Sequence, residues 1–140
     1  MKTKRVAVDA ASQVLAALHT LTFPGDAAPA WREDGLAWIT YDGEDPVAFL
    51  YAEPITDELW YFSRVGVMPA ARGQGLQGKL MALMERALAG TAVVSTTYEN
   101  PASANRFVAR RWKTYIPAYR WGAAGTIYWY KDLRCSKPSR

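Results

Sequence analysis

A glycine-rich turn between a strand and a helix is the part of this sequence best suited to chemistry. The turn reads Arg72-Gly73-Gln74-Gly75-Leu76-Gln77-Gly78, and it follows a predicted strand at Tyr61–Val67 and then Pro69. Its three glycines let the backbone approach a ligand with N–H groups directed inward, and the positive end of the following helix attracts phosphate. The turn therefore predicts a pyrophosphate-binding site. A glycine-rich turn that binds nothing is the alternative.

Several other kinds of site are disfavoured by the residue types present. The turn lacks the Lys-Ser/Thr ending of an ATP-type P-loop and the spacing and downstream acid of a dinucleotide fingerprint. The chain has one histidine, His19, and one cysteine, Cys135, so a metal site, a Ser-His-Asp triad and an internal disulfide are not expected. We expect His19 to be a surface or half-buried residue of a helix. The single cysteine suits a reducing cytoplasm.

Hydrophobic periodicity predicts the elements that must hold the turn in place. Leucines recur at helical spacing after Asp9 or Ser12, either of which can cap the first helix, and again from Leu76 to a stop at Gly90. An arginine-rich helix is predicted at 101–112. The predicted strands are 5–8, 36–41, 47–52, 59–67, 92–97, 114–121 and 126–133. This order predicts an α/β (α+β) fold with a single mixed, mostly antiparallel sheet of six to seven strands and helices on both faces.

Length and composition fit a single domain over residues 1–140. Half of the residues are hydrophobic and 21% are charged, the balance of a globular protein. Apolar runs are all interrupted before ~18 residues, so we expect no membrane partner, and the N-terminal pattern does not resemble a signal peptide. A formal charge of +4 and a pI near 9.3 favour an anionic partner such as a phosphorylated cofactor, nucleic acid or an acidic protein.

At the glycine-rich turn the chain resembles the GNAT superfamily of acetyl-CoA-dependent N-acyltransferases. That family carries Gln/Arg-x-x-Gly-x-Gly/Ala after a strand that ends in Val-x-Pro. Val67-Met68-Pro69 followed by Arg72 to Gln77 matches it except at the last place, where Gln77 replaces a small residue. A second family element places four residues on its Asn, small, Tyr and Phe positions: Asn100, Ser103, Phe107 and Trp112. The resemblance extends over most of the chain, is greatest to small bacterial and phage-borne members, and implies a sheet splayed at its central strands.

The resemblance implies an N-acetyltransferase that uses acetyl-CoA as cosubstrate and needs no metal. It assigns the pyrophosphate to the turn, whose members are Arg72, Gly73, Gln74, Gly75, Leu76, Gln77 and Gly78. It assigns the pantetheine arm and thioester to the backbone of Val65, Gly66 and Val67, where Gly66 suits a bulge. It also implies that Asn100 and Ser103 reach the same arm, with helix capping and packing as their alternatives. The acceptor would be a small-molecule or peptide amine, and a homodimer is left open.

Acyl transfer from a thioester needs a deprotonated amine, a polarised carbonyl and often a proton donor for the leaving thiolate. Many GNAT members place a tyrosine donor where this chain has Phe107, so the donor is absent or comes from elsewhere. Tyr98, Tyr115 and Tyr119 are the candidates. A thiolate can also leave unaided, because a thiol pKa of about 8.5 makes it a fair leaving group.

Charged residues at the ends of predicted elements are the remaining candidates for the site. Candidate bases acting through water are Glu58, Glu99 and Glu53, with solvated loop charge as the alternative. Arg64 would face an acceptor carboxylate or pair with a neighbouring acid. Four cations would meet the adenosine phosphates or remain in solvent: Lys79, Arg106, Arg110 and Arg111.

Two other functions remain open at this stage. The first is a protein that binds CoA or another phosphate compound without catalysis, which would suit the missing tyrosine. The second is a nucleic-acid-binding module built from basic and aromatic residues. The second is disfavoured, because most of the aromatic residues fall in strand patterns, where core packing is their ordinary use.

Overall fold

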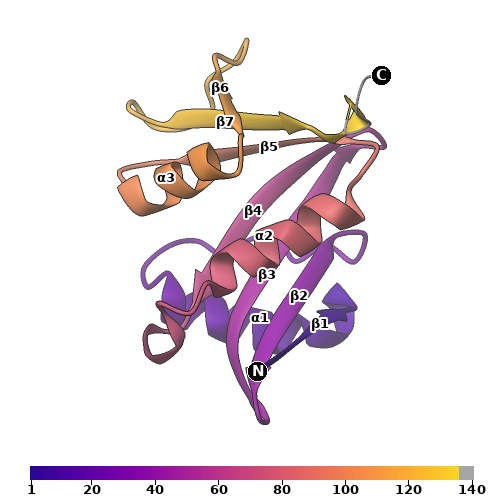
Figure 1. Ribbon diagram of the computed structural model, residues 1–140, viewed down its shortest axis with the longest axis vertical. Coiled ribbons are helices and arrows are strands. Elements are labelled where there is room, and N and C mark those ends of the chain that lie inside the picture. Colours follow the sequence, from indigo (N-terminus) through magenta and orange to yellow (C-terminus); the bar gives the residue numbers. More distant parts are fainter. Residues whose placement is uncertain (136–140) are drawn as a thin grey trace. The chain divides into compact units, whose positions relative to one another are not determined.

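The computed structural model describes residues 1–135. Its elements, in chain order, are β1 (Lys2–Val6), α1 (Val8–Thr22), β2 (Leu36–Asp42), β3 (Asp45–Thr56), β4 (Leu59–Val67), η1 (Pro69–Ala71), α2 (Leu76–Ala87), β5 (Ala92–Thr97), α3 (Pro101–Ala109), β6 (Lys113–Tyr115), β7 (Ile127–Asp132) and η2 (Leu133–Cys135) (Figure 1). The seven strands within this part of the chain form one sheet in the order β1-β2-β3-β4-β5-β7-β6. The β4–β5 pair is parallel, whereas β1–β2, β2–β3, β5–β7 and β6–β7 are antiparallel. The expected fold class is confirmed.

The chain divides into two compact units. Unit 1 comprises Met1–Pro54 with Ser63–Ala87, and unit 2 comprises, within the described part of the chain, Ile55–Phe62 with residues 88–135. Strand β4 therefore gives its first residues to unit 2 and its last residues to unit 1. The single domain expected from the length stays a prediction. Within residues 1–135, no helix is long and apolar enough to cross a membrane.

In unit 1, α1 begins earlier than the sequence pattern predicts. The expected caps were Asp9 or Ser12, but the helix starts at Val8, and its N-cap, Ala7, makes no side-chain cap bond. The predicted first strand is present, but its bounds were wrong: it was expected at 5–8, whereas β1 is Lys2–Val6, paired with β2 from Lys2↔Tyr41 to Val6↔Ala37. Val8 is only 1% exposed. Its burial places the first turn of α1 against the core, and packing thereby overrides the local capping signals.

The hairpin of β2 and β3 carries a core on each face. Its turn contains Gly43 at φ +64°, a left-handed conformation that favours glycine. One face packs on α1 through Ala37, Ile39, Phe49 and Tyr51. The alternating residues, such as Trp38 and Leu50, are also buried and face α2, because side chains alternate across a strand. Figure 1 shows α1 and α2 on opposite faces of these strands. Helices on both faces were expected.

His19, the single histidine, is not on the surface. It is 1% exposed, and its ring stacks on Phe23 with centroids 5.2 Å apart and meets Trp31 and Phe49 edge-on. Leu21, which the helical pattern placed on the apolar face, is 59% exposed instead. The buried side of α1 therefore turns toward aromatic residues from the segment after the helix and from β3. The expectation of a surface or half-buried histidine was wrong.

In unit 2, α3 ends three residues before the predicted Trp112. Arg111 adopts φ +68°, and the N–H groups of Arg111 and Trp112 donate to the carbonyls of Val108 and Phe107 at 3.0 and 2.9 Å. This is the Schellman arrangement that stops a helix, with an arginine where glycine is usual. The Trp112 ring lies 4.7 Å from that of Phe107, which supplies the apolar contact of the motif. A C-terminal capping motif with this ring contact therefore ends the helix.

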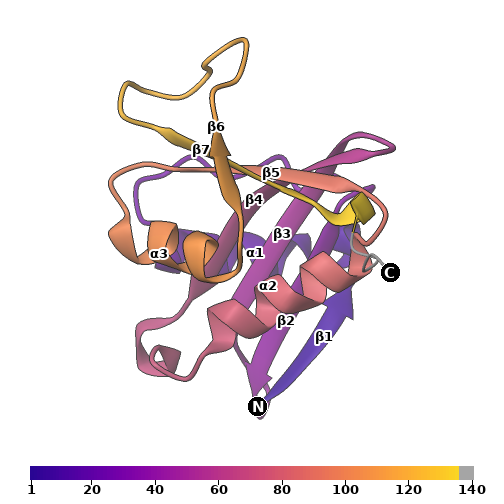
Figure 2. The ribbon, with the colours of Figure 1, turned by 45° about the horizontal axis from the view of Figure 1, so that its top comes forward.

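The last two strands pair antiparallel, as predicted, but β6 is much shorter than expected. It covers Lys113–Tyr115, paired with β7 from Lys113↔Tyr130 to Tyr115↔Tyr128, where the sequence predicted a strand at 114–121. Figure 2 shows the chain between β6 and β7 as an extended loop. Ile116 and Tyr119 are each 76% exposed, so the aromatic and β-branched pattern there does not mark a buried strand.

Candidate functional site

The glycine-rich turn of unit 1 has the geometry of an anion-binding helix N-terminus. Gly73 and Gly75 have φ of +82° and +75°, and no atom lies within 4 Å of a Cβ added to either residue. The carbonyl of Gly75 accepts the N–H of Lys79 at 3.1 Å, so α2 begins directly after it. The first-turn N–H groups of Leu76, Gln77 and Gly78 consequently have no acceptor within the helix. Helix N-terminal groups of this kind bind phosphate, and the space beside Gly73 and Gly75 is open.

Arg72, the first residue of the turn, bonds back to the preceding strand. Its Nε donates to the carbonyl of Val67 at 3.0 Å, and its side chain is exposed. Pro69 starts the short η1 helix, in which Ala71 donates to Met68 at 2.9 Å. The strand, η1 and the turn are thus tied together locally, and the guanidinium group remains beside the turn that it begins.

Strand β4 contacts different neighbours before and after the segment Ser63–Val67. The carbonyl of Phe62 accepts the Ser95 hydroxyl of β5 at 2.7 Å, whereas the N–H of Met68, the residue after β4, donates to Val47 of β3 at 2.8 Å. The bulge at Gly66 that the family resemblance implies stays a prediction.

Gly66 itself is required by close packing. A Cβ there would lie 2.5 Å from Thr22 Oγ1 and 2.7 Å from Phe49 Cε1, both far inside van der Waals contact. The residue therefore lets β4 approach α1 and β3. The expectation that Val65, Gly66 and Val67 offer backbone groups to a pantetheine arm stays a prediction.

Arg64 pairs with a neighbouring acid, one of its two expected roles. Its Nη1 lies 3.7 Å from Asp26 Oδ2, its Nη2 donates to the Ala27 carbonyl at 3.4 Å, and its guanidinium lies 4.9 Å from the Phe23 ring centroid. These contacts tie the segment after α1 to β4. The arginine thus has a structural role in unit 1.

At the start of α3 in unit 2, Asn100 is the helix cap. Its Oδ1 accepts the N–H of Ser103 at 3.1 Å, the alternative weighed against a ligand contact. Glu99, just before it, has φ +49°, a costly conformation for a residue with a Cβ. Asn100 and Glu99 are exposed and Ser103 is half-buried. Any contact of Asn100 or Ser103 with the pantetheine arm stays a prediction.

Phe107, at the usual tyrosine position, belongs to an aromatic core. It is 4% exposed, stacks on Trp129 with centroids 5.1 Å apart and meets Phe62 at 5.9 Å. Two buried polar groups nearby are satisfied, because Trp129 Nε1 donates to Thr97 Oγ1 at 2.9 Å and Ser95 donates to Phe62.

Tyrosines gather on the opposite face of the unit 2 strands. The register Thr96↔Tyr128 and Tyr115↔Tyr128 places Tyr115 and Tyr128 on one face, and their rings lie 6.2 Å apart. Burial raises the pKa of the Tyr115 hydroxyl, and the neighbouring Tyr128 and Tyr61 add to the effect. Tyr115 is therefore protonated at neutral pH and can donate a proton but does not serve as a base.

Tyr115 borders a cavity of about 910 Å³ in unit 2, and Tyr98 lies beside one of the residues that line it. Tyr115 lines it directly, and Tyr98 Cε1 lies 3.6 Å from the position of a Cβ on Gly125, another lining residue. Tyr119 is 76% exposed and is not among the lining residues. Sequence reasoning missed this cavity, since it read the segment through Trp121 as a strand. The signal in the sequence that could have revealed the cavity loop was the pair Gly122 and Gly125, because a tight turn alone does not require two glycines.

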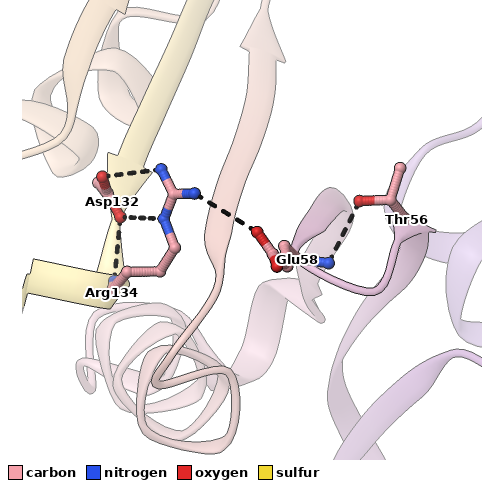
Figure 3. A network of polar contacts seen from close by, with 4 residues as sticks. All are labelled: Thr56, Glu58, Asp132 and Arg134. Atoms are coloured by element: carbon pink, nitrogen blue, oxygen red, sulfur yellow. Dashed lines mark hydrogen bonds and ion pairs between the residues drawn. The ribbon is translucent and has the colours of Figure 1, made fainter.

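Glu58 does not lie near Asn100. It sits where β4 begins, and its carbonyl accepts the N–H of Ala92, the first residue of β5, while Asn100 follows the other end of β5. Six residues of strand, about 20 Å, separate these ends. The Glu58 carboxylate lies 3.7 Å from Arg134 Nη1, and Arg134 also bonds Asp132, lowering the pKa of that carboxyl (Figure 3). Glu58 is thus part of a surface ion network.

The remaining charged candidates have mixed surroundings. In unit 1, Glu53 Oε1 accepts the Tyr51 hydroxyl at 2.9 Å, and burial raises the pKa of that tyrosine. The cations expected near adenosine phosphates or in solvent are exposed at Lys79 and Arg111 and half-buried at Arg106 and Arg110. Among residues 1–135, no group of three or more His, Cys, Asp or Glu side chains could hold a metal ion.

The model of the Acetyltransferase (GNAT) family matches residues 11–111, more than two thirds of the chain. The chain belongs to this family. GNAT membership indicates an acyltransferase. Comparison with curated proteins gives no match.

Solved structures of GNAT-type acetyltransferases share the fold. An aminoglycoside 6'-acetyltransferase type Ii is 17% identical with a TM-score of 0.77, covering 100% of both chains. The IAA acetyltransferase from Bacillus cereus is 12% identical with a TM-score of 0.75, covering 94% of this chain and 99% of that one. PaiA N-acetyltransferase from Thermoplasma acidophilum, solved in complex with coenzyme A, is 9% identical with a TM-score of 0.65 over 94% of this chain and 99% of that one. At these identities the likeness shows the fold alone.

Proposed function

We propose that this GNAT protein transfers an acetyl group from acetyl-CoA to a primary amine. The observation that carries the proposal is the turn before α2, where Gly73 and Gly75 hold left-handed backbone in open space. Side chains there would be strained and would fill the space beside the free N–H groups. Such a turn suits the pyrophosphate of CoA, because a doubly charged ligand gains from both the N–H groups and the helix dipole.

The chemistry proposed is nucleophilic attack by the amine on the thioester. The nitrogen lone pair forms a bond to the carbonyl carbon, the carbon–sulfur bond breaks, and the products are an amide and the CoA thiol. The backbone N–H of Val67 is the candidate contact for the carbonyl oxygen, since hydrogen-bond donors stabilise developing negative charge. Glu99, acting through water, is the candidate for removing the amine proton.

Tyr115 and Tyr98 are the candidate proton donors for the leaving thiolate. The Tyr115 hydroxyl is protonated at neutral pH, as that of an ordinary tyrosine is, and Tyr115 lines the cavity of unit 2. Tyr98 lies beside Gly125, one of the lining residues. A thiolate with a pKa of about 8.5 also leaves without a dedicated acid. The burial of Phe107 in the core removes that position from proton transfer in either case.

A screen of amines with acetyl-CoA, read by release of free thiol, tests the function. We expect thiol release that depends on both the protein and a particular amine. Calorimetric titration with CoA runs in parallel. Binding of CoA without thiol release across broad classes of amine would favour the alternative, a CoA-binding protein without catalysis. Absence of CoA binding would reject the proposal.

A further inference from the structure

The cavity of unit 2 lies under the loop that joins β6 and β7. Twelve residues line it, all from Thr114 to Tyr128. Its walls are mostly apolar or aromatic, with Tyr115, Ile116, Ile127 and Tyr128 among them. A volume of about 910 Å³ is in the range of small-molecule sites. The space is large enough for an acceptor with a ring or a branched apolar body.

The loop over the cavity is held in a definite shape. The N–H of Gly122 donates to the Tyr128 hydroxyl at 2.8 Å, and the Trp121 ring meets the Tyr128 ring edge-on at 4.7 Å. A Cβ on Gly122 would lie 2.6 Å from Thr126 Oγ1, so the chain passes itself closely there. Gly125 has φ +94°. These features specify a formed wall.

Charge distinguishes this cavity from a site for polycations. Arg120 is the one charged residue among the twelve that line it, and none of them is acidic. Arg120 is exposed, and within residues 1–135 no acidic side chain forms an ion pair with it. A guanidinium binds carboxylates through paired hydrogen bonds. A ligand with several positive charges would meet the like charge of Arg120 and no acidic partner among the lining residues.

We propose that this cavity selects the acceptor and takes amines that carry an aromatic or apolar body together with a carboxylate. The ring would pack on Tyr115 and Tyr128, since aromatic faces favour aromatic partners. The carboxylate would pair with Arg120. Polycationic amines such as spermidine would be excluded. The assignment of the ligand as an acceptor rests on the proposed acetyltransferase function.

The test is calorimetric binding of three probes to the full chain, with and without CoA, which carries no acetyl group to transfer. The probes are L-phenylalanine, 2-phenylethylamine, which lacks the carboxylate, and spermidine. We expect L-phenylalanine to bind about tenfold more tightly than 2-phenylethylamine, as one charge-assisted pair at an exposed site allows. Arg120→Gln should remove this difference. Arg86→Gln, which removes an exposed arginine of α2 outside the cavity, should keep it.

Binding and turnover separate the two proposals. Spermidine binding as tightly as L-phenylalanine, or a carboxylate preference that survives Arg120→Gln, would overturn the cavity assignment. If thiol release is then seen with polyamines, the acetyltransferase function stands without it. If the carboxylate preference holds but no amine gives thiol release, the cavity binds this ligand class and the acetyltransferase function is the one rejected.

Discussion

Replacing Gly75 with valine is the sharpest perturbation of the proposed CoA site. Gly75 has φ +75°, and no protein atom lies within 4 Å of an added Cβ. The new side chain would therefore meet no neighbour in the protein and would project into the space proposed for phosphate. Left-handed backbone costs an L-residue about 1–2 kcal/mol. A domain with a stability of about 5–15 kcal/mol tolerates this loss, so the variant should fold.

The loss of binding can be converted into a melting temperature. Two lost hydrogen bonds to charged phosphate, at about 1.5 kcal/mol each, weaken binding about 100-fold. With CoA at about 100 times the wild-type Kd, the wild type gains about 2.7 kcal/mol and the variant about 0.4 kcal/mol. An unfolding entropy of about 2.1 cal/mol/K per residue over 140 residues gives about 0.29 kcal/mol/K. CoA should then raise Tm by about 9 °C in the wild type and about 1.5 °C in the variant.

Gly43→Val is the matched control. Gly43 has φ +64° and no atom within 4 Å of an added Cβ, and it lies in the turn between β2 and β3. The same strain should lower Tm without CoA to a similar extent, while the response to CoA stays complete. Thermal scans of the three proteins across a CoA titration make the comparison. An equal CoA response in Gly75→Val and wild type would refute the reasoning and remove the turn from the site.

Three further predictions follow from packing and titration. Phe107→Tyr should change turnover of the best amine by less than about tenfold, well below the roughly 10²- to 10⁴-fold of a general acid, because the ring lies in the core beside Trp129; a large gain in rate would show that an acid belongs there. Gly66→Ala should destabilise the protein by about 1–3 kcal/mol, since its Cβ would lie 2.5 Å from Thr22 Oγ1; urea unfolding unchanged from wild type would contradict this. Burial lowers the pKa of His19, so below about pH 6.5 the unfolded chain takes up a proton that the folded one does not, and the free energy of unfolding falls with a slope of up to about 1.4 kcal/mol per pH unit. His19→Leu should lose this slope when urea unfolding is compared at about pH 7.5 and about pH 5.5; an equal slope in both proteins would count against it.

Elements with strong local signals could be predicted from the sequence. Strand β5 was predicted at 92–97, as observed, and α2 begins at the predicted Leu76. The glycine-rich turn was also recognised, since the left-handed conformations of Gly73 and Gly75 are ones that glycine adopts readily. Periodicity and turn chemistry act between near neighbours in the chain, and these features depend on little else.

The ends of other elements depended on distant partners. The α3 helix stops early where Trp112 packs on Phe107 and also on Phe62 of β4, which is distant in the sequence, and β6 stops at Tyr115, after which the chain forms the cavity loop. His19 is buried by aromatic rings that lie later in the chain. Each outcome is set by side chains that local periodicity does not relate to one another.

The GNAT family, the class of fold and the turn suited to a pyrophosphate can be recognised in the sequence, because they depend on short motifs and on hydrophobic spacing. The folded structure is needed to show which polar groups are already engaged. Arg64 is paired with Asp26, Asn100 caps α3, and Glu58 belongs to an ion network at the far end of β5. The structure also places Arg120 in a cavity whose lining residues include no aspartate or glutamate. Whether a charged side chain has a partner is a matter of distance in space, and residue type and spacing alone do not specify that distance.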